Sequence, residues 1–307
     1  MKSRVLTAVS VLIVVAFVVF MVVDFSFSSG KKEPADKSVS EPVTEDMWHI
    51  SGIYDCKEGS LKAVAAGPDG DIFIGGESFI TRLTGDLFQK WTIETEEPVT
   101  ALSWCGQTLY ASTREKLLLV GTGGEITGEW GPYESSSLIT SVSSSDRLVA
   151  FADAYNKRIF LLNKEGEVIN MIGLSGHRFI IPSPYFDVLL RDNTIYTANT
   201  GMHRVEEWTA DGRLTDTFGV AGLAHDAFCG CCNPAHFTAY GNGFITAEKG
   251  INRIKILALD GGFVESVSSV NNFTPSVPLD VAAHEGRIYG ANAADSRLYV
   301  FARRQSD

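Results

Sequence analysis

The chain of 307 residues lacks the sequence motifs of several large enzyme classes. It contains no G-x-S-x-G elbow, no H-E-x-x-H zinc motif and no phosphate-binding P-loop. The glycine-rich stretch at 121–124 does not replace a P-loop, because no helical pattern follows it. The absence of these motifs gives no support for an enzyme of any of these classes. We therefore expect a binding protein more than an enzyme.

Positive charge is also scarce. The sequence has 26 Lys and Arg against 37 Asp and Glu, which gives a net charge of −11 at pH 7. A body with this charge is repelled by nucleic acid and by anionic lipid headgroups. This balance excludes nucleic-acid binding as a function.

One long apolar run, residues 5–23, follows Lys2 and Arg4 and precedes Asp24. Its length suits a membrane-spanning helix, and the flanking charges predict a cytoplasmic N-terminus. We therefore expect an uncleaved signal anchor over residues 1–23, with a single pass through a bacterial cytoplasmic membrane. A cleaved signal peptide is the alternative. Residues 24–46 are polar and read as a flexible linker, which places the body at 47–303 in the periplasm.

The body repeats one plan six times. Each repeat has short apolar stretches separated by polar turns, and an acid or amide stands five residues before an Arg in five of them. These pairs are Glu77 and Arg82, Asp153 and Arg158, Asn199 and Arg204, Glu248 and Arg253, and Asn292 and Arg297. The apolar stretches are typical of strands, and helical patterns are absent between them. Such repeats predict an all-β, six-bladed β-propeller with four-stranded blades.

The ends of the repeats indicate how the ring closes. The sixth repeat stops after its third strand, at residues 301–302, while the stretch 48–54 is strand-like and precedes the first repeat. We expect this N-terminal stretch to supply the missing outer strand of blade six, which leaves no large open sheet edge. We interpret the acid-to-Arg pairs as structural clamps at the turn between the second and third strands.

The repeat pattern resembles NHL-repeat six-bladed β-propellers over residues 47–303. The sequences FCGCCNP at 228–234 and AEKG at 247–250 are similar to those of a bacterial subset of these propellers. One departure is Ala198-Asn199-Thr200, where that subset would have Asn-Pro. The resemblance implies an extracytoplasmic propeller, and for some members an association with iron–sulfur and flavin electron-transfer proteins.

The cluster Cys229, Cys231 and Cys232 is the main candidate for chemistry. The propeller plan puts it on the link between blades four and five, at the mouth of a central funnel, with Cys56 on the same face. Three interpretations remain open: a structural disulfide within the cluster or to Cys56, a metal ion or iron–sulfur cluster held with His236, or a redox-active thiol. The spacing lacks the paired C-x-x-C of a standard cluster.

Three further residues are candidates for ligand binding at the funnel. Asp187 and Asp280 occupy matching places on the inner strands of blades four and six, and Asn233 follows the cysteine cluster. Together with His236 they could hold a cation on the axis, as in propeller lactonases and lyases, but Asp187 and Asp280 could instead bind the backbone of neighbouring blades.

From these features we expect a membrane-anchored binding or scaffold module with a cysteine-lined central funnel, which takes a protein partner or a small ligand there. A metal- or redox-active accessory protein of an electron-transfer system, and a metal-dependent hydrolase or lyase, are the alternatives.

Overall fold

The structure is a computed structural model that describes residues 47–304, except 175, 231, 270–272 and 275–276. The expected transmembrane helix and linker, residues 1–46, lie outside the described residues. Within the described part of the chain, no helix is long and apolar enough to cross a membrane.

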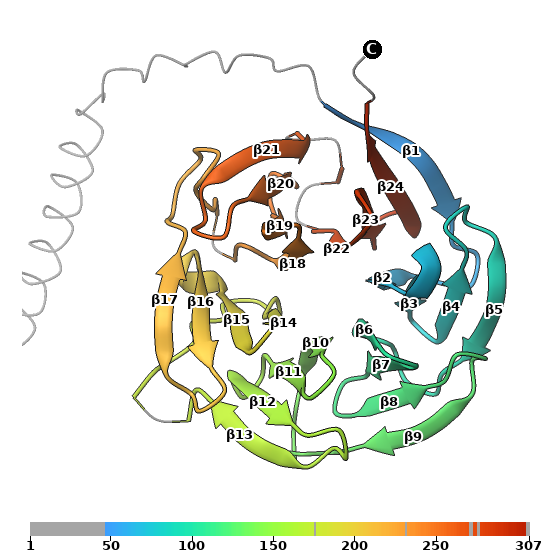
Figure 1. The fold of residues 1–307 in the computed structure, drawn as a ribbon, viewed down its shortest axis with the longest axis horizontal. Helices are drawn as coiled ribbons and strands as arrows, with labels where there is room; N and C mark the ends of the chain where they lie inside the picture. The colour runs from blue at the N-terminus through green and yellow to red at the C-terminus, as the bar shows by residue number, and fades with distance from the viewer. Residues whose placement is uncertain (1–46, 175, 231, 270–272, 275–276, 305–307) are drawn as a thin grey trace, which may run out of the picture. The chain divides into compact units, whose positions relative to one another are not determined.

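The described residues form 24 strands in six antiparallel sheets of four strands, arranged as blades around a central axis (Figure 1). Blade one contains β2 (Leu61–Ala66), β3 (Ile72–Gly76), β4 (Phe79–Leu83) and β5 (Gln89–Glu94). Blade two contains β6 (Ala101–Cys105), β7 (Thr108–Ser112), β8 (Leu117–Val120) and β9 (Ile126–Trp130). Blade three contains β10 (Ile139–Ser144), β11 (Val149–Asp153), β12 (Arg158–Leu162) and β13 (Val168–Ile172).

The second half of the ring repeats this order. Blade four contains β14 (Val188–Arg191), β15 (Thr194–Asn199), β16 (Arg204–Thr209) and β17 (Leu214–Phe218). Blade five contains β18 (His236–Tyr240), β19 (Gly243–Ala247), β20 (Ile254–Leu257) and β21 (Phe263–Ser268). Blade six contains β22 (Asp280–His284), β23 (Arg287–Asn292), β24 (Arg297–Arg303) and β1 (Trp48–Asp55). Two single-turn 3-10 helices, η1 (Pro68–Gly70) and η2 (Thr200–Met202), lie in turns.

The predicted six-bladed propeller and its closure by the N-terminal strand are confirmed. In blade six, β1 pairs with β24, so that Trp48 lies opposite Arg303 and Asp55 opposite Arg297. Trp48 is 2% exposed and packs in a cluster that joins blades five and six. This pairing joins the two ends of the repeat array and gives blade six its fourth, outermost strand.

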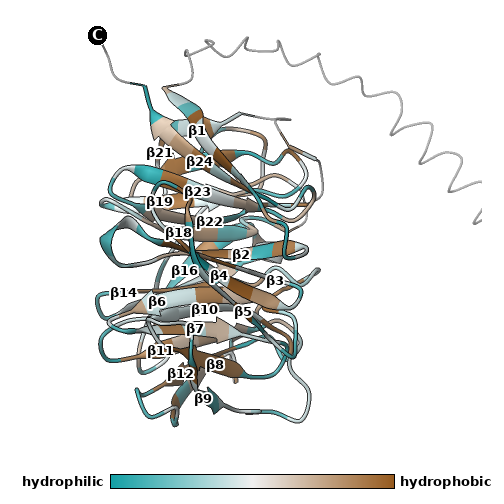
Figure 2. Cartoon of the chain, turned by 90° about the vertical axis from the view of Figure 1, so that its right-hand side faces the viewer, coloured by the Kyte–Doolittle hydropathy of each residue, from teal (hydrophilic) through white to brown (hydrophobic). Residues whose placement is uncertain are grey.

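Burial follows the position of each strand in its blade. Second strands such as β3, β11 and β19 are buried at every residue, whereas outer strands such as β17 are mostly exposed. Brown hydrophobic segments accordingly concentrate within the strands, while several of the loops are teal (Figure 2). The apolar residues therefore pack between adjacent blades, because each sheet is covered on both faces by its neighbours.

The acid-to-Arg pairs do not act as one repeated clamp. In blade five Arg253 donates to Glu248 at 2.7 Å. In blade three Asp153 instead accepts three backbone N–H groups from the adjoining link and turn, and Arg158 reaches Glu134 at 2.7 Å. The acidic residue of each pair thus fixes the turn in both blades, but the residue that the Arg side chain contacts differs from one blade to the other.

The two faces of the propeller carry different connections. One face, here called the link face, carries the links from each outer strand to the next inner strand and the turns between second and third strands. The link over residues 219–235, which contains the cysteine cluster, lies on this face. Cys105 ends β6 at a turn on the opposite face.

Candidate functional site

A cavity of about 180 Å³ lies on the propeller axis and is lined by the inner strands of all six blades. Its ionisable side chains are Asp187, His236 and Asp280, which come from blades four, five and six. Small hydroxyl groups such as Thr100, Ser143 and Thr238 and apolar residues form much of the remaining wall. Its described lining contains no Lys or Arg, so the acidic groups dominate its charge.

These three ionisable residues come together because each lies at the beginning of an inner strand. Asp187 directly precedes β14, while His236 and Asp280 open β18 and β22. The Nδ1 atom of His236 lies 3.6 Å from Asp280 Oδ1 and 3.8 Å from Asp187 Oδ2. The structure therefore gathers three of the residues singled out from the sequence at the link-face end of the cavity.

Both carboxylates also join neighbouring blades. Asp187 Oδ2 accepts the backbone N–H of Phe237 at 2.8 Å, and Asp280 Oδ2 accepts that of Val64 at 2.8 Å. In each case the other oxygen accepts the N–H of the residue that follows the Asp. These bonds satisfy N–H groups on the unpaired edges of inner strands. Asp187 also hydrogen-bonds the Ser141 side chain. On Asp280 each carboxylate oxygen keeps room for one further donor.

Burial controls the protonation of this group. It raises the pKa of Asp187 to about 6 and that of Asp280 to about 7, because little water reaches either carboxylate. It also lowers the pKa of His236, against the attraction of the Asp187 charge. The carboxyl groups therefore change charge near neutral pH beside an imidazole that favours its neutral form, an arrangement that can hold or release a proton.

The described cysteines do not line the cavity. Cys229 is 5% exposed and Cys232 is 2% exposed. The backbone N–H of Cys229 donates to Glu248 Oε2 at 3.1 Å, and its Sγ atom faces the Lys249 carbonyl at 3.9 Å. None of the described cysteines is among the lining residues of the cavity, so the expected cysteine-lined funnel is wrong for them. The link turns the side chain of Cys229 toward blade five. Cys231 lies outside the described residues, so the disulfide, metal and thiol interpretations stay predictions.

Asn233 holds the same link. Its Nδ2 atom donates to the carbonyls of Cys229 at 2.5 Å and Lys249 at 2.9 Å, and its Oδ1 atom accepts the N–H of Lys249 at 2.7 Å. Asn233 is 1% exposed, and both ends of its amide are occupied. It serves the fold of the link and offers nothing to a ligand in the cavity.

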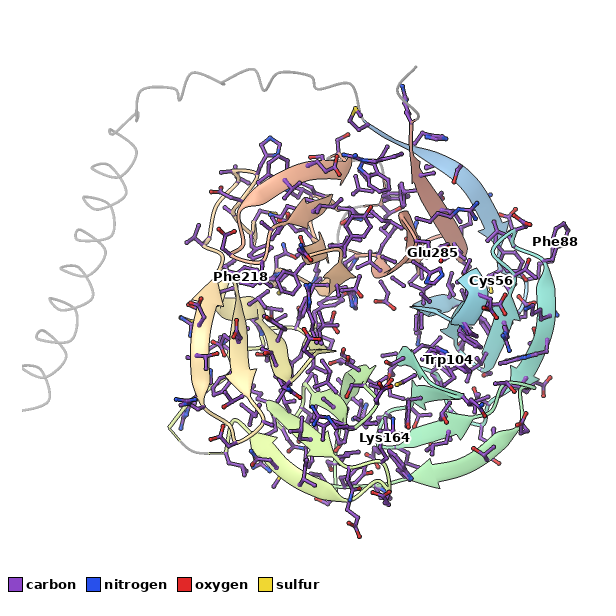
Figure 3. The ribbon with its side chains drawn as sticks, in the orientation of Figure 1. Cys56, Phe88, Trp104, Lys164, Phe218 and Glu285 are labelled. Carbon is purple, nitrogen blue, oxygen red and sulfur yellow. The ribbon has the colours of Figure 1, made fainter. Side chains whose placement is uncertain are left out.

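Cys56 lies in another part of the molecule. Its thiol donates to Glu58 at 3.3 Å, and it packs beside a core cluster of blades six and one (Figure 3). Burial raises the pKa of Cys56 to about 11. The contacts of Cys229 are in blade five, so the structure does not bring these two cysteines together.

A buried ionic group in blade five contains the Glu248 and Arg253 pair expected from the sequence, together with Lys255, which the sequence interpretation missed. The side chains of Glu248, Arg253 and Lys255 are at most 3% exposed, and Glu248 Oε1 lies 2.7 Å from Arg253 Nε and 3.2 Å from Lys255 Nζ. The two cations donate to backbone carbonyls within 223–227. This group, the blade-five clamp, holds the cysteine-bearing link. Its signal was the charged spacing E-K-G-I-N-R-I-K.

The described residues contain no group of three or more His, Cys, Asp or Glu side chains arranged to hold a metal ion. The Asp187, His236 and Asp280 group does not meet that arrangement. The expected metal site with Cys229, Cys231, Cys232 and His236 is therefore not supported within the described part of the chain.

No protein-family model and no curated relative matches this sequence. Solved structures do match. A Bacteroides thetaiotaomicron protein of unknown function has 17% identity and a TM-score of 0.62, with 82% of this chain and 72% of that one covered. A streptogramin B lyase has 14% identity and a TM-score of 0.58, with 85% and 88% covered.

A third similar structure is a catalytically inactive histidine-to-alanine variant of virginiamycin B lyase from Staphylococcus aureus, solved with quinupristin. It has 15% identity and a TM-score of 0.53, with 80% of this chain and 82% of that one covered. At these identities the similarity establishes the β-propeller fold of this chain.

Proposed function

We propose that this protein is an NHL-like, membrane-anchored, extracytoplasmic binding module whose axial cavity takes a small cationic ligand. The anchor and the location rest on the apolar run at residues 5–23 and its flanking charges. The observation that carries the ligand class is the charge of the cavity, where Asp187 and Asp280 stand on a wall without Lys or Arg among its described residues.

The size of the cavity limits the ligand. Pockets for drug-sized ligands have volumes of roughly 300–1,000 Å³, whereas this cavity has about 180 Å³. A small organic amine suits this space, because its N–H donors match the remaining acceptor positions on the two carboxylates. Such a cation favours the charged form of each carboxylate, so binding releases protons and strengthens as the pH rises through 6 to 7.

Calorimetry on the full-length protein in detergent tests this proposal, with ethanolamine and putrescine as probes. We expect heat of binding for the amines at pH 8, weaker binding at pH 5.5, and loss of binding in Asp280→Asn. Acetamide, which is similar in size to ethanolamine but neutral, is the control ligand. Equal binding of amine and acetamide, or binding that ignores Asp280→Asn, would falsify the proposal. Circular dichroism confirms that the variant is folded.

A lyase is the second candidate, favoured by one specific observation. His236, whose lowered pKa favours the neutral imidazole, lies beside the carboxylates of Asp187 and Asp280. A neutral imidazole can act as a general base, and the two carboxylates would stabilise the imidazolium that forms. Two of the similar folds are lyases, and one was made inactive by replacing a histidine. Incubation of the full-length protein with quinupristin tests this candidate. Consumption that is lost in His236→Ala would support it, and no consumption by the unmodified protein would reject quinupristin-type lyase activity.

The redox alternative rests on the cluster Cys229, Cys231 and Cys232 and stays a prediction. Burial raises the pKa of Cys229, which works against a reactive thiolate at that position. Metal analysis and thiol counting on the purified protein test this alternative directly.

A further inference from the structure

Backbone groups on the inner strands also face the axial cavity. The inner strand of each blade is the first of its sheet, so one of its edges pairs with no strand of that sheet and faces the axis. On three of these edges, an Asp side chain accepts an N–H group of a lining residue. Asp280 accepts from Val64 at 2.8 Å and from Val281 at 2.9 Å. Asp187 accepts from Phe237 at 2.8 Å.

The carbonyl groups of these three residues point the same way. In an antiparallel pair, the N–H and C=O groups of one residue lie on the same side of its strand. The carbonyls of Val64, Phe237 and Val281 therefore face the cavity from blades one, five and six, and they are here called the axial carbonyls. Blade four differs, because the Val188 carbonyl already accepts the Ser141 hydroxyl at 3.4 Å.

The axial carbonyls lie next to the carboxylates. Phe237 directly follows His236 in the chain, and Val281 directly follows Asp280. The N–H of Val64 is held by the same Asp280. The ionisable end of the cavity thus combines carboxylate oxygens with carbonyl oxygens, each of which takes hydrogen-bond donors. Such a set of acceptors can pair with the N–H groups of a cation as well as balance its charge.

Aromatic side chains form no alternative cation site within the described lining of the cavity. Quaternary ammonium ions, which lack N–H groups, are held by cages of aromatic faces. The lining contains Phe237 and Trp104. Phe237 is 4% exposed and its ring packs on Phe244, with the ring centroids 6.2 Å apart. Trp104 lies near the other end of its strand, β6, and stacks on Phe73 at 5.0 Å.

Tyr185 contacts His236 from outside this lining. The two ring centroids are 5.9 Å apart and the rings are nearly perpendicular. One face of the Tyr185 ring already carries the Lys249 ammonium, 4.9 Å from the centroid. That face is occupied by a cation of the protein itself, so Tyr185 does not complete an aromatic cage for a ligand.

We propose that the axial carbonyls make the cavity selective for primary amines over N-methylated and quaternary amines. This inference rests on the proposed function, since it names the class of cation that the same cavity takes. A primary ammonium has three N–H donors, which can pair with a carboxylate and with the axial carbonyls at once. Each N-methyl group removes one donor and leaves a buried acceptor without a partner, which is costly, while the charge of the ligand stays the same.

Calorimetry on the full-length protein in detergent at pH 8 tests this selectivity with ethanolamine, N,N-dimethylethanolamine and choline. We expect choline to bind at least about tenfold more weakly than ethanolamine, with dimethylethanolamine between them. The control for bulk is 2-amino-2-methyl-1-propanol, an isomer of dimethylethanolamine that keeps the primary amine and should bind like ethanolamine.

The outcomes separate this inference from the proposed function. Equal binding of ethanolamine and choline would overturn the selectivity and leave the cationic ligand in place. Binding of the isomer as weak as that of dimethylethanolamine would show that bulk decides, and would also overturn it. No binding of ethanolamine would refute the proposed function together with this inference.

Carbonyl chemical shifts test the contact itself. The sequence contains five Val-Ala pairs. In protein labelled with carbonyl-¹³C valine and ¹⁵N alanine, NMR detects only the peptide bonds of these pairs, and replacing each alanine assigns the signals. Val64 and Val281 belong to two pairs, while Val149 and Val220 belong to others and do not line the cavity. We expect ethanolamine to shift the first two signals and to leave the other two in place. Ethanolamine binding without a shift at Val64 and Val281 would refute the role of the axial carbonyls.

Discussion

The blade-five clamp makes a sharp prediction for Glu248→Gln. The carboxylate of Glu248 is fully buried and balances two buried cations, Arg253 at 2.7 Å and Lys255 at 3.2 Å. The amide of glutamine keeps the shape of the side chain but removes the negative charge. Removing one member of a buried ionic group leaves uncompensated charge and costs about 3–5 kcal/mol. For a domain of this size, that loss lowers the melting temperature by about 6–20 °C.

The assay is urea and thermal unfolding followed by tryptophan fluorescence, with Glu129→Gln as the matched control. Glu129 pairs with Lys116 at 2.7 Å, but its side chain is 45% exposed. An exposed ion pair contributes about 0–1 kcal/mol, so the control should unfold close to the unmodified protein. Equal losses in the two variants would refute the interpretation that buried charge holds the link.

The pH dependence of the Glu248→Gln variant gives a second signature. Burial lowers the pKa of Lys255 to about 8 in the folded protein, from 10.5. A base with a lowered folded pKa destabilises the folded state at low pH, and this cost disappears as the pH rises between the folded and unfolded values. Removal of Glu248 takes away a charge that raises the Lys255 pKa. The deficit of the variant should therefore shrink from pH 6 to pH 9, and a constant deficit would contradict this account.

Three further predictions concern stability and thiol reactivity. Burial raises the folded pKa values of Asp187 and Asp280, so the protonated carboxyl groups favour the folded state over the unfolded state. This contribution to the free energy of unfolding is full below pH 3.8 and is lost as the pH rises through 6 to 7. The lowered pKa of His236 makes stability rise with pH, but only below pH 6.5. Thermal unfolding should therefore show that stability falls from pH 6.5 to pH 8. In Asp280→Asn this fall should be smaller. At pH 7.5 the Cys56 thiol should react with iodoacetamide about 100-fold more slowly in the folded than in the urea-unfolded protein, because its pKa is about 11 instead of 9.0. Mass spectrometry measures both rates, and equal rates would contradict the burial of this thiol. Trp48→Ala should lower the free energy of unfolding by about 3–5 kcal/mol, measured in urea, because a buried aromatic side chain leaves a cavity; a loss below about 1 kcal/mol would contradict that packing.

The order of the strands and the closure of the ring could be predicted from the sequence. They depend on the local periodicity of apolar residues and on the number of strands in each repeat. Each blade repeats the same apolar stretches, and the sixth repeat is one strand short, which identifies the stretch containing Trp48 as its complement. The meeting of Asp187, His236 and Asp280 could also be anticipated, since the first residues of inner strands face the axis at one end.

The conformation of the long link could not be predicted from the same signals. The direction of Cys229 depends on a hydrogen bond from its backbone to Glu248, 19 residues later in the chain. The partner of Arg158 is Glu134, 24 residues earlier and outside the repeated pattern. Tertiary contacts of this kind have no periodicity, so the sequence indicated where the cysteines lie along the ring but not which way their side chains point.

The pairing of β1 with β24 has a consequence for biosynthesis. Ser51 hydrogen-bonds the Val300 carbonyl across 249 residues of intervening chain. At about 5–20 residues per second, roughly 12–50 s separate the synthesis of these two positions. During that interval β1 has no partner strand, and the Trp48 side chain is left without the cover that blade six gives it. The ring can lock only when the last strand arrives, so a nascent chain stalled late in translation should remain open and prone to aggregation.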